Sequence, residues 1–505
     1  MNARFLLFLL AATLPLAAQP ALDTPFQSGM VLQRDAQVKL SGRAAPDSPV
    51  SIAWRGQRLE TRADARGRWQ HRLDIGAATT EGCTLRVQDR EGNTELRDIL
   101  AGDVWLASGQ SNMEFLLGRS TGGAALSEAM QDPALRLLRV RHLLPTGPGS
   151  YSPEQYRAAE RSDFFRFEWV RATPEELRDF SAVGAVFAHE LRRAEPGVPI
   201  GIICNAVGGS GMESWTPRRV IDRAPLYARI RGERWQRSPD YDAWMRGRAE
   251  ENLRRVREAG IARPLHAFAP SVLYEYAVAP LTALPIKGVI WYQGESNADE
   301  PDTARNAERL RLLIAAWRRA FGQKELPFIM VQLPRIADPK RPHWGAFRTA
   351  QKQVADALPG VELICTVDLG SSTREVHPPD KAPVGRRLAA TALRCVYGQD
   401  QPRYPVLHTA ARRPQGMLLR STEPLRSTDG APPRGFELAD APDAVFRPAT
   451  AELRGDTILL QGEGRVWRYN EGTALEPNLV GAESGLPVFP ARSYGADDAR
   501  SAKGS

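Results

Sequence analysis

The chain has 505 residues, 42% hydrophobic and 25% charged, a composition that excludes a largely disordered protein. This length predicts about two to four domains. The excess of Lys and Arg over Asp and Glu gives a formal net charge of +8 without a dense basic run, so we expect no nucleic-acid partner. The cysteines are widely spaced and form no Cys/His cluster, which argues against a structural zinc site, a disulfide-dense fold or an essential disulfide.

The first residues are typical of a secretory signal. Arg4 precedes an apolar stretch at residues 5–12 that is too short to cross a bilayer, and the small residues Ala17 and Ala18 follow. We therefore expect a signal peptide over residues 1–18 and a secreted, periplasmic mature protein. No later stretch is apolar enough for a transmembrane helix, so we expect no membrane association after cleavage.

The hydrophobic pattern divides the mature chain into three parts. Residues 19–100 alternate apolar and polar residues between turns, which predicts an N-terminal β-sandwich-like domain. In residues 101–400, apolar strands alternate with amphipathic helices, which predicts a mostly parallel sheet with helices on both faces. Residues 217–260 within this part predict a helical excursion. Short strands return in a C-terminal β-rich domain at 401–494, and the polar residues 495–505 predict a flexible tail.

Residues of catalytic type follow the predicted strands of the middle part. The strands are expected at residues 104–107, 199–205, 288–292, 328–333 and 361–367. In chain order, the segments after them contain Ser111, Gly209, Gln293, Glu295 and His377. Ligands bind at the carboxyl edge of such a sheet, so one crevice can hold a serine, a glycine turn, an amide, an acid and a histidine. This set is typical of acyl transfer.

Each of these residues also has a plainer interpretation. Ser111 could cap a helix, Glu295 could be a solvated loop acid, and a histidine such as His377 is often structural. Position 113 is Met, so Ser111 is not in the G-x-S-x-G motif of an α/β-hydrolase nucleophile elbow. The shared position at the strand ends is what favours catalysis.

Three segments resemble the sialate O-acetylesterases of the SGNH-type hydrolase superfamily. They are residues 103–113, with Gly-Gln-Ser-Asn-Met at the end, residues 290–297, with Trp-Tyr-Gln-Gly-Glu-Ser-Asn, and residues 377–389, which begin His-Pro-Pro-Asp-Lys. Further similar segments at 26–33 and between 435 and 487 extend the resemblance over nearly the whole mature chain. The resemblance implies an SGNH-hydrolase-like α/β fold and a serine esterase.

The resemblance also implies roles for particular residues. It makes Ser111 the nucleophile and His377 the general base. The N–H of Ser111, an N–H near Gly209 and the Gln293 side chain would form the oxyanion hole. We expect four residues near these segments to contact the substrate: Asn112, Trp215, Arg218 and Asn297.

The acid that orients the histidine departs from the common SGNH pattern. Many SGNH enzymes have Asp three residues before the histidine, but here that residue is Arg374. Asp368, Glu375 and Glu295 are the candidates. On an extended segment Glu375 would be poorly placed to bond the ring of His377. Glu295 follows a different strand and could face the imidazole across the crevice, as the related acetylesterases suggest, so we expect Glu295.

The sequence thus predicts a serine esterase that removes O-acetyl groups from a glycan, with sialic acid as the sugar that the resemblance implies. It contains no HExxH motif and no calcium-loop pattern, so we expect no metal and no cofactor. One alternative is an acetylesterase for a neutral polysaccharide such as xylan. Another is a catalytically inactive carbohydrate-binding scaffold, which two β-rich regions and 11 tryptophans would suit.

Overall fold

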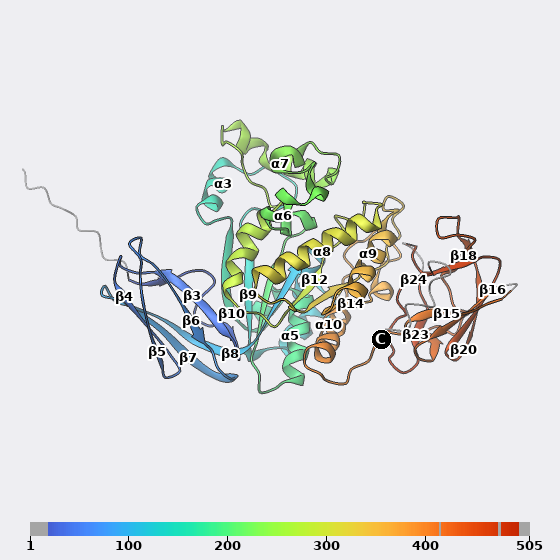
Figure 1. Ribbon diagram of the computed structural model, residues 1–505, viewed down its shortest axis with the longest axis horizontal. Coiled ribbons are helices and arrows are strands. Elements are labelled where there is room, and N and C mark those ends of the chain that lie inside the picture. The colour runs from blue at the N-terminus through green and yellow to red at the C-terminus, as the bar shows by residue number, and fades with distance from the viewer. Residues whose placement is uncertain (1–18, 414–415, 473–475, 494–505) are drawn as a thin grey trace, which may run out of the picture.

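The computed structural model describes residues 19–413, 416–472 and 476–493. The predicted signal segment 1–18 and the predicted tail 495–505 lie outside the described residues. A central α/β body lies between an N-terminal and a C-terminal β-rich region along the long axis of the molecule (Figure 1). None of the described helices has the length and apolarity needed to cross a membrane.

A seven-strand run of one large sheet forms the middle of the body, in the order β10-β9-β11-β8-β12-β13-β14. Neighbouring strands are parallel except at the edge, where β10 pairs antiparallel with β9. The strands are β8 (Asn93–Gly109), β9 (Asp132–His142), β10 (Phe165–Ala172), β11 (Ile200–Ala206), β12 (Gly288–Tyr292), β13 (Phe328–Val331) and β14 (Val361–Ile364). Every residue of β12 and β13 is buried, as expected for strands covered on both faces.

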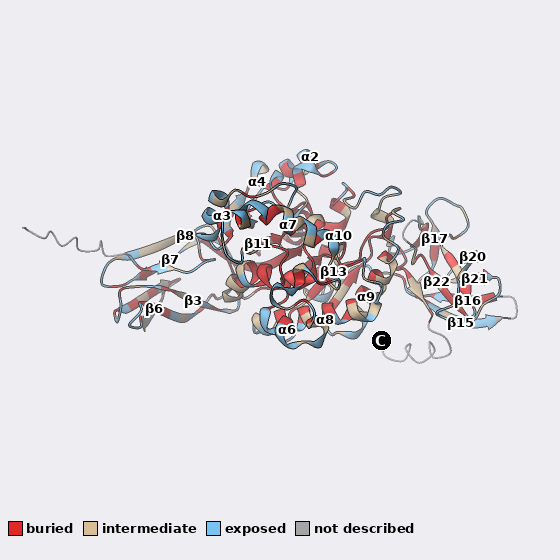
Figure 2. Cartoon of the chain, turned by 90° about the horizontal axis from the view of Figure 1, so that it is seen from above, coloured by how far each residue is buried: buried red, intermediate tan, exposed pale blue. Residues whose placement is uncertain are grey.

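Helices cover both faces of this sheet, and Figure 2 shows buried residues concentrated between the layers. The helices α8 (Thr303–Ala320) and α9 (Trp344–Ala357) pack together on one face. On the other face α5 (Ala182–Ala194) packs against α10 (Ala382–Cys395). The fold class predicted from the sequence, a mostly parallel α/β sheet with β-rich flanks, is therefore confirmed.

Shorter helices lie outside these two layers. Three lie along the edge of the body near β9 and β10: α2 (Gly123–Ala129), α3 (Pro153–Glu160) and α4 (Pro174–Arg178). The predicted helical excursion contains α6 (Arg218–Arg223) and α7 (Ala243–Glu258), and α7 packs against α3 (Figure 1). Asp242 caps α7 by accepting a hydrogen bond from the Met245 N–H at 2.7 Å.

Strand β8 belongs to two parts of the molecule at once. Its first half pairs with β2 (Val31–Gln33) and β7 (Thr79–Gln88) of the N-terminal region, and its second half pairs with β11 and β12. The other N-terminal strands are β1 (Ala21–Leu22), β3 (Gln37–Arg43), β4 (Pro49–Trp54), β5 (Gln57–Arg62) and β6 (Arg68–Asp74). Their buried side chains join the hydrophobic core of the α/β body. The division at residue 100 stays a prediction, and β8 passes through that position.

The C-terminal region has a hydrophobic core of its own. Its strands are β15 (Leu407–Arg413), β16 (Gly416–Ser421), β17 (Leu425–Ser427), β18 (Phe436–Ala439), β19 (Arg447–Pro448), β20 (Thr450–Arg454), β21 (Thr457–Gln461), β22 (Val466–Tyr469), β23 (Leu479–Gly481) and β24 (Ala491–Arg492). Arg348 of α9 ties this region to the body. Its buried guanidinium donates to the carbonyl of Pro334 at 2.7 Å and to that of Gly472 at 3.2 Å.

The sequence analysis did not identify β9 and β10. In β9, Arg136 and Arg139 interrupt the apolar run, although both side chains are buried in the structure. Each is accommodated by a carboxylate, since Arg136 pairs with Asp98 at 3.1 Å and Arg139 pairs with Glu176. A buried strand with two paired arginines does not have the uninterrupted apolar pattern that marks the other parallel strands.

The close approach of β8 and β12 at Gly109 leaves no room for a larger side chain there. The φ of Gly109 is +141°, and a Cβ at this position would lie 2.0 Å from the carbonyl oxygen of Tyr292 on β12. Gly109→Ala should therefore lower the free energy of unfolding by about 2–4 kcal/mol. Urea denaturation measures this. The matched control is Gly147→Ala, at an exposed loop position with open space for a Cβ. This substitution should change the free energy of unfolding by less than about 0.5 kcal/mol. Equal stability of the two variants would contradict the prediction.

Candidate active site

The turn after β8 presents Ser111. Gln110 has an extended backbone, and Ser111 is the first residue of the short helix α1 (Ser111–Glu114). Gly109 allows the chain to turn directly beside β12, where an ordinary side chain would collide with the Tyr292 carbonyl. Ser111 is half-buried, and it therefore stands at the carboxyl edge of the sheet within reach of a ligand.

His377 lies opposite Ser111, on the loop between β14 and α10. The imidazole Nε2 is 2.7 Å from Ser111 Oγ, a hydrogen-bond distance. With the ring proton on Nδ1, the serine hydroxyl donates to Nε2. A backbone hydrogen bond of 3.0 Å from Thr121 N–H to the Pro379 carbonyl joins the two loops. The structure thus brings together the predicted nucleophile and the predicted base.

The carboxylate beside the imidazole is Glu375, not the expected Glu295. Glu375 Oε1 lies 3.4 Å from His377 Nδ1 and accepts the His377 backbone N–H at 2.7 Å. The expectation against Glu375 assumed an extended segment, whereas residues 370–381 form no strand, and their bend brings this carboxylate to the ring. Asp368 forms a bidentate pair with Arg387 at 2.7 and 2.6 Å.

Glu295 instead belongs to a buried cluster with Asn112 and Lys381. Asn112 donates through Nδ2 to Glu295 Oε1, and its Oδ1 accepts a hydrogen bond from Lys381 Nζ. The same Nδ2 donates to the carbonyl of Val376 at 2.9 Å. Asn112 follows Ser111 and Val376 precedes His377, so this amide connects the two catalytic loops.

The charges of the cluster are affected by its burial. Burial raises the pKa of the Glu295 carboxyl, and the Asn112 hydrogen bond opposes this change. Burial lowers the pKa of Lys381 to about 8, while the nearby Glu295 charge acts in the opposite direction. The Lys381 ammonium also lies 5.0 Å from the centre of the Phe115 ring and 5.8 Å from that of Tyr292.

The predicted oxyanion donors fall into two groups. Within the described chain, the backbone N–H groups of Ser111 and Gly209 have no hydrogen-bond partner. The neighbouring Gly208 N–H is already bonded to Glu114 Oε2 at 2.8 Å. The Gln293 side chain is fully buried, and its Nε2 donates to Asn297 Oδ1 at 2.7 Å. It therefore supports the loop from inside, and its role as an oxyanion donor stays a prediction.

Of the four predicted substrate contacts, three are buried and one is exposed, and their contact with a substrate stays a prediction. Asn112 and Asn297 are buried and hold loops together, and Asn297 also accepts the Met212 N–H at 3.0 Å. Trp215 is fully buried, with its Nε1 donating to Ser210 Oγ at 2.9 Å. Arg218 is exposed and lines a different cavity, beside Trp235 and Arg257. The hydrogen bonds of the two asparagines and of Trp215 hold together the loops that carry Ser111 and His377 and the segments beside them.

The sequence analysis overlooked three residues near the site. Lys381 belongs to the His-Pro-Pro-Asp-Lys motif, but the burial of its side chain cannot be deduced from its neighbours Asp380 and Ala382. Arg119 lies in the 117–121 segment that contacts the His377 loop, and its charge is one of the causes that lower the His377 pKa. Trp244 lies against Gly209, from an excursion more than thirty residues further along the chain.

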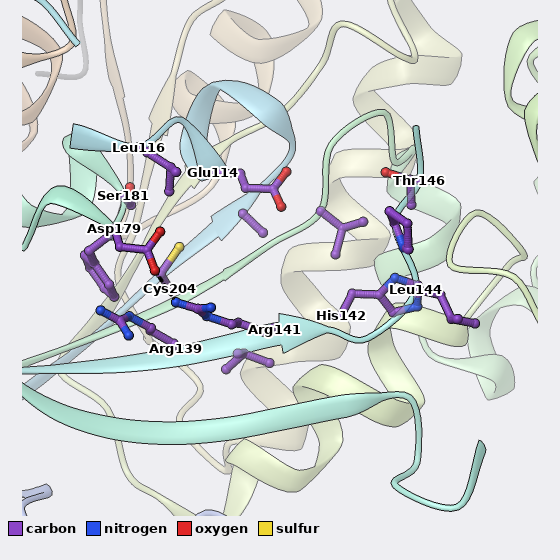
Figure 3. A pocket seen from close by; sticks show the side chains of 15 residues that line it. Glu114, Leu116, Arg139, Arg141, His142, Leu144, Thr146, Asp179, Ser181 and Cys204 are labelled. Atoms are coloured by element: carbon purple, nitrogen blue, oxygen red, sulfur yellow. Dashed lines mark hydrogen bonds and ion pairs between the residues drawn. The ribbon is translucent and has the colours of Figure 1, made fainter. Parts of the chain in front are cut away.

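A cavity of about 280 Å³ adjoins the Ser111 turn on the side of Glu114 (Figure 3). Neither Ser111 nor His377 lines it. Its arginines are already paired with carboxylates, Arg139 with Glu176 and Arg141 with Asp179. Burial lowers the pKa of His142 in its wall to about 4, so this imidazole is neutral at ordinary pH. The cavity therefore offers no uncompensated positive charge to an anionic ligand.

The described residues contain no group of three or more His, Cys, Asp or Glu side chains arranged to hold a metal ion. The four cysteines are unpaired in the structure. The chemistry available at this edge of the sheet is that of a serine, an imidazole, a carboxylate and two free backbone N–H groups.

The family model for the carbohydrate esterases called sialic acid-specific acetylesterases matches residues 101–237 and 256–394. The chain belongs to this family of carboxylic-ester hydrolases. Both segments with the catalytic loops lie inside the matched residues, and α7 lies mostly in the gap between them. The family resemblance noted in the sequence is thereby confirmed.

This esterase is similar to curated and solved relatives. The sialate O-acetylesterases of Homo sapiens and Mus musculus are 29% and 28% identical to it over 60% of its chain. The alignments cover 55% and 58% of those proteins, so the chain matches little more than half of their length. A carbohydrate acetylesterase from Xanthomonas citri is 30% identical with a TM-score of 0.77, covering 94% of this chain and 99% of that one.

The charges around His377 predict the pH dependence of this esterase. Burial and the Lys381 charge lower the pKa of His377 below 6.5, and Glu375 raises it. A base must be neutral to accept a proton, so the acid limb of kcat/KM should have its midpoint below pH 6.5. Lys381→Met should move the midpoint to higher pH, and Glu375→Gln should move it to lower pH. Rates on 4-nitrophenyl acetate across the pH range measure both shifts.

Lys324→Met is the control for this experiment, since it removes an exposed lysine elsewhere. It should leave the midpoint unchanged. Shifts of the same sign in Lys381→Met and Glu375→Gln would contradict the assigned charge interactions.

Proposed function

We propose that this protein hydrolyses O-acetyl esters on sugars, with Ser111 as nucleophile and His377 as general base. The observation that carries the proposal is the 2.7 Å distance between Ser111 Oγ and His377 Nε2 at the carboxyl edge of the sheet. A serine hydroxyl becomes an effective nucleophile when a neutral imidazole takes its proton. Membership of the carbohydrate esterase family supports the same reaction.

The reaction proceeds in two acyl-transfer steps. Ser111 Oγ attacks the acetyl carbonyl carbon while its proton moves to His377 Nε2, and the carbonyl oxygen becomes an oxyanion. The N–H groups of Ser111 and Gly209 are free to stabilise that charge. The sugar oxygen then leaves with the proton from His377, and acetyl-Ser111 remains. Water, deprotonated by His377, attacks the acetyl group, and acetate leaves as Ser111 regains its proton.

Glu375 is the acid we assign to the triad, in place of Glu295. Its position 3.4 Å from Nδ1 favours the tautomer with Nε2 free to accept, and it stabilises the imidazolium that forms. The Glu375 side chain is 54% exposed, so water weakens this interaction relative to a buried acid. Glu295 acts indirectly, by accepting the hydrogen bond that holds Asn112 between the two loops.

The sugar is an O-acetylated sialic acid in our proposal. The name of the matching family supports it, and so does Arg119. This exposed guanidinium has no carboxylate partner among the described residues, yet it lies close enough to lower the His377 pKa. A sialic acid carries a carboxylate that such a guanidinium can bind. A neutral acetylated polysaccharide is the second candidate, because the name of the similar carbohydrate acetylesterase from Xanthomonas citri does not specify a sialic acid.

We further propose that the chain is exported to the periplasm and that residues 1–18 are removed there. The positive residue, short apolar stretch and small residues at the N-terminus support this proposal. The substrate would then be an extracytoplasmic glycan.

The first test is hydrolysis of 4-nitrophenyl acetate. Ser111→Ala and His377→Ala should each lower kcat by at least about 10³-fold, because each removes a reacting group. Glu375→Gln should lower kcat by about 10- to 100-fold with little change in KM, since it acts on the transition state. Ser372→Ala, at an exposed serine five residues before His377, is the control and should keep full activity. Full activity in Ser111→Ala would refute the assignment.

Replacing Arg119 distinguishes between the two candidate substrates. If a sialic acid carboxylate binds it, Arg119→Met should lower kcat/KM on O-acetylated N-acetylneuraminic acid by about two- to fivefold, as expected for an exposed ion pair. Its kcat/KM on acetylated xylo-oligosaccharides should be unchanged. Arg161→Met, at an exposed arginine on another edge, is the matched control. Faster turnover of the xylan ester by the wild-type protein would favour the neutral polysaccharide.

A further inference from the structure

One tryptophan differs from all the others in its exposure. Trp244 is 52% exposed, whereas the other ten of the 11 tryptophans are buried. It lies in the first turn of α7 (Ala243–Glu258). A large exposed apolar side chain on an amphipathic helix has a hydration cost that a ligand could remove.

The indole lies directly against the catalytic edge. A Cβ on Gly209 would be 2.7 Å from the Cη2 and Cζ3 atoms of Trp244, so the ring touches the backbone of that glycine. Gly209 has a φ of +76° and carries one of the two free N–H groups of the proposed oxyanion hole. A molecule whose ester lies between Ser111 and Gly209 therefore has Trp244 as its neighbour.

The ring is held in place by its surroundings. Its centre is 5.7 Å from that of Phe268, and the Arg248 guanidinium lies 5.6 Å from the ring. The next residue, Met245, is buried and packs against Gly211, and Asp242 caps the helix. A side chain fixed in this way loses little conformational entropy when it binds a ligand.

We propose that Trp244 is the platform on which the pyranose ring of the acetylated sugar stacks while its acetyl group reaches Ser111. This inference rests on the proposed function. The C–H face of a pyranose is apolar and flat, and an exposed indole face offers the matching surface. The acetyl group itself is small, so most of the contact area between substrate and protein must come from the sugar ring.

The position of Trp244 in the chain indicates that this residue contributes to substrate specificity. The family model matches residues 101–237 and 256–394, so Trp244 lies in the unmatched segment 238–255. Ser111, Gly209 and His377 all lie within matched residues. The proposed reacting groups thus lie in parts of the chain that the family model matches, while this platform lies in a part that it does not match.

The test measures sugar binding without turnover. In a Ser111→Ala background, calorimetric titration with O-acetylated N-acetylneuraminic acid and with acetylated xylo-oligosaccharides gives Kd. Adding Trp244→Leu, which keeps an apolar side chain but removes the aromatic face, should raise Kd for the bound sugar by about tenfold. Adding Trp244→Phe should raise it by no more than about threefold. Val445→Ala, at a residue 86% exposed in the C-terminal region, is the control and should not change it.

Equal Kd values for the Leu and Phe variants would contradict the proposal that Trp244 stacks on the sugar. A Kd for Trp244→Leu equal to that of the protein with Trp244 would contradict it as well. Failure of both sugars to bind the Ser111→Ala protein would also overturn it. A change in oligomeric state on Trp244→Leu with unaltered sugar binding would assign the ring to contact between copies instead. Ser111-dependent hydrolysis of 4-nitrophenyl acetate tests the esterase function separately, so the two proposals can fail independently.

Discussion

Continuous pairing along β8 is the constraint on which the rest of the molecule depends. The strand runs from the N-terminal β region into the middle of the central sheet, and its last residue, Gly109, lies against Tyr292 of β12. Ser111 follows two residues later. The buried carboxylate of Asp103, halfway along the strand, accepts hydrogen bonds from Arg34 at 2.9 and 3.0 Å. Ser111 is therefore positioned by hydrogen bonds that extend through two regions of the protein.

The candidate active site combines partly exposed groups around His377 with a buried support. Glu375 is exposed beside the imidazole, whereas Glu295 and Lys381 are taken out of water on either side of Asn112. Removing charges from water is costly, and such groups persist where hydrogen bonds compensate the cost. Asn112 provides those bonds and also binds the carbonyl before His377. The buried pair thus stabilises the geometry between two loops rather than the charge on the substrate.

Much of the fold and part of the site could be predicted from the sequence. Apolar runs identified the buried parallel strands except β9, and the residues after them included Ser111 and His377, whose side chains the structure brings together. Predictions failed where a side chain's surroundings decide its role. Arg139 in β9 is buried because Glu176 pairs with it, and Trp215 and Trp244 differ in exposure although both are tryptophans of one region. Local sequence patterns do not contain the packing partners that distinguish such cases.

The contact between Ser111 and His377 joins two residues that are far apart in the chain. Ser111 and His377 are 266 residues apart in the chain, yet their side chains meet at 2.7 Å. A contact between residues so far apart closes a long loop, and closing it costs conformational entropy. The strands that form between the two residues must offset this cost. β11, β12, β13 and β14 all come from that interval. The Ser111–His377 pair is therefore assembled late in folding, and a nascent or partly folded chain does not yet have it.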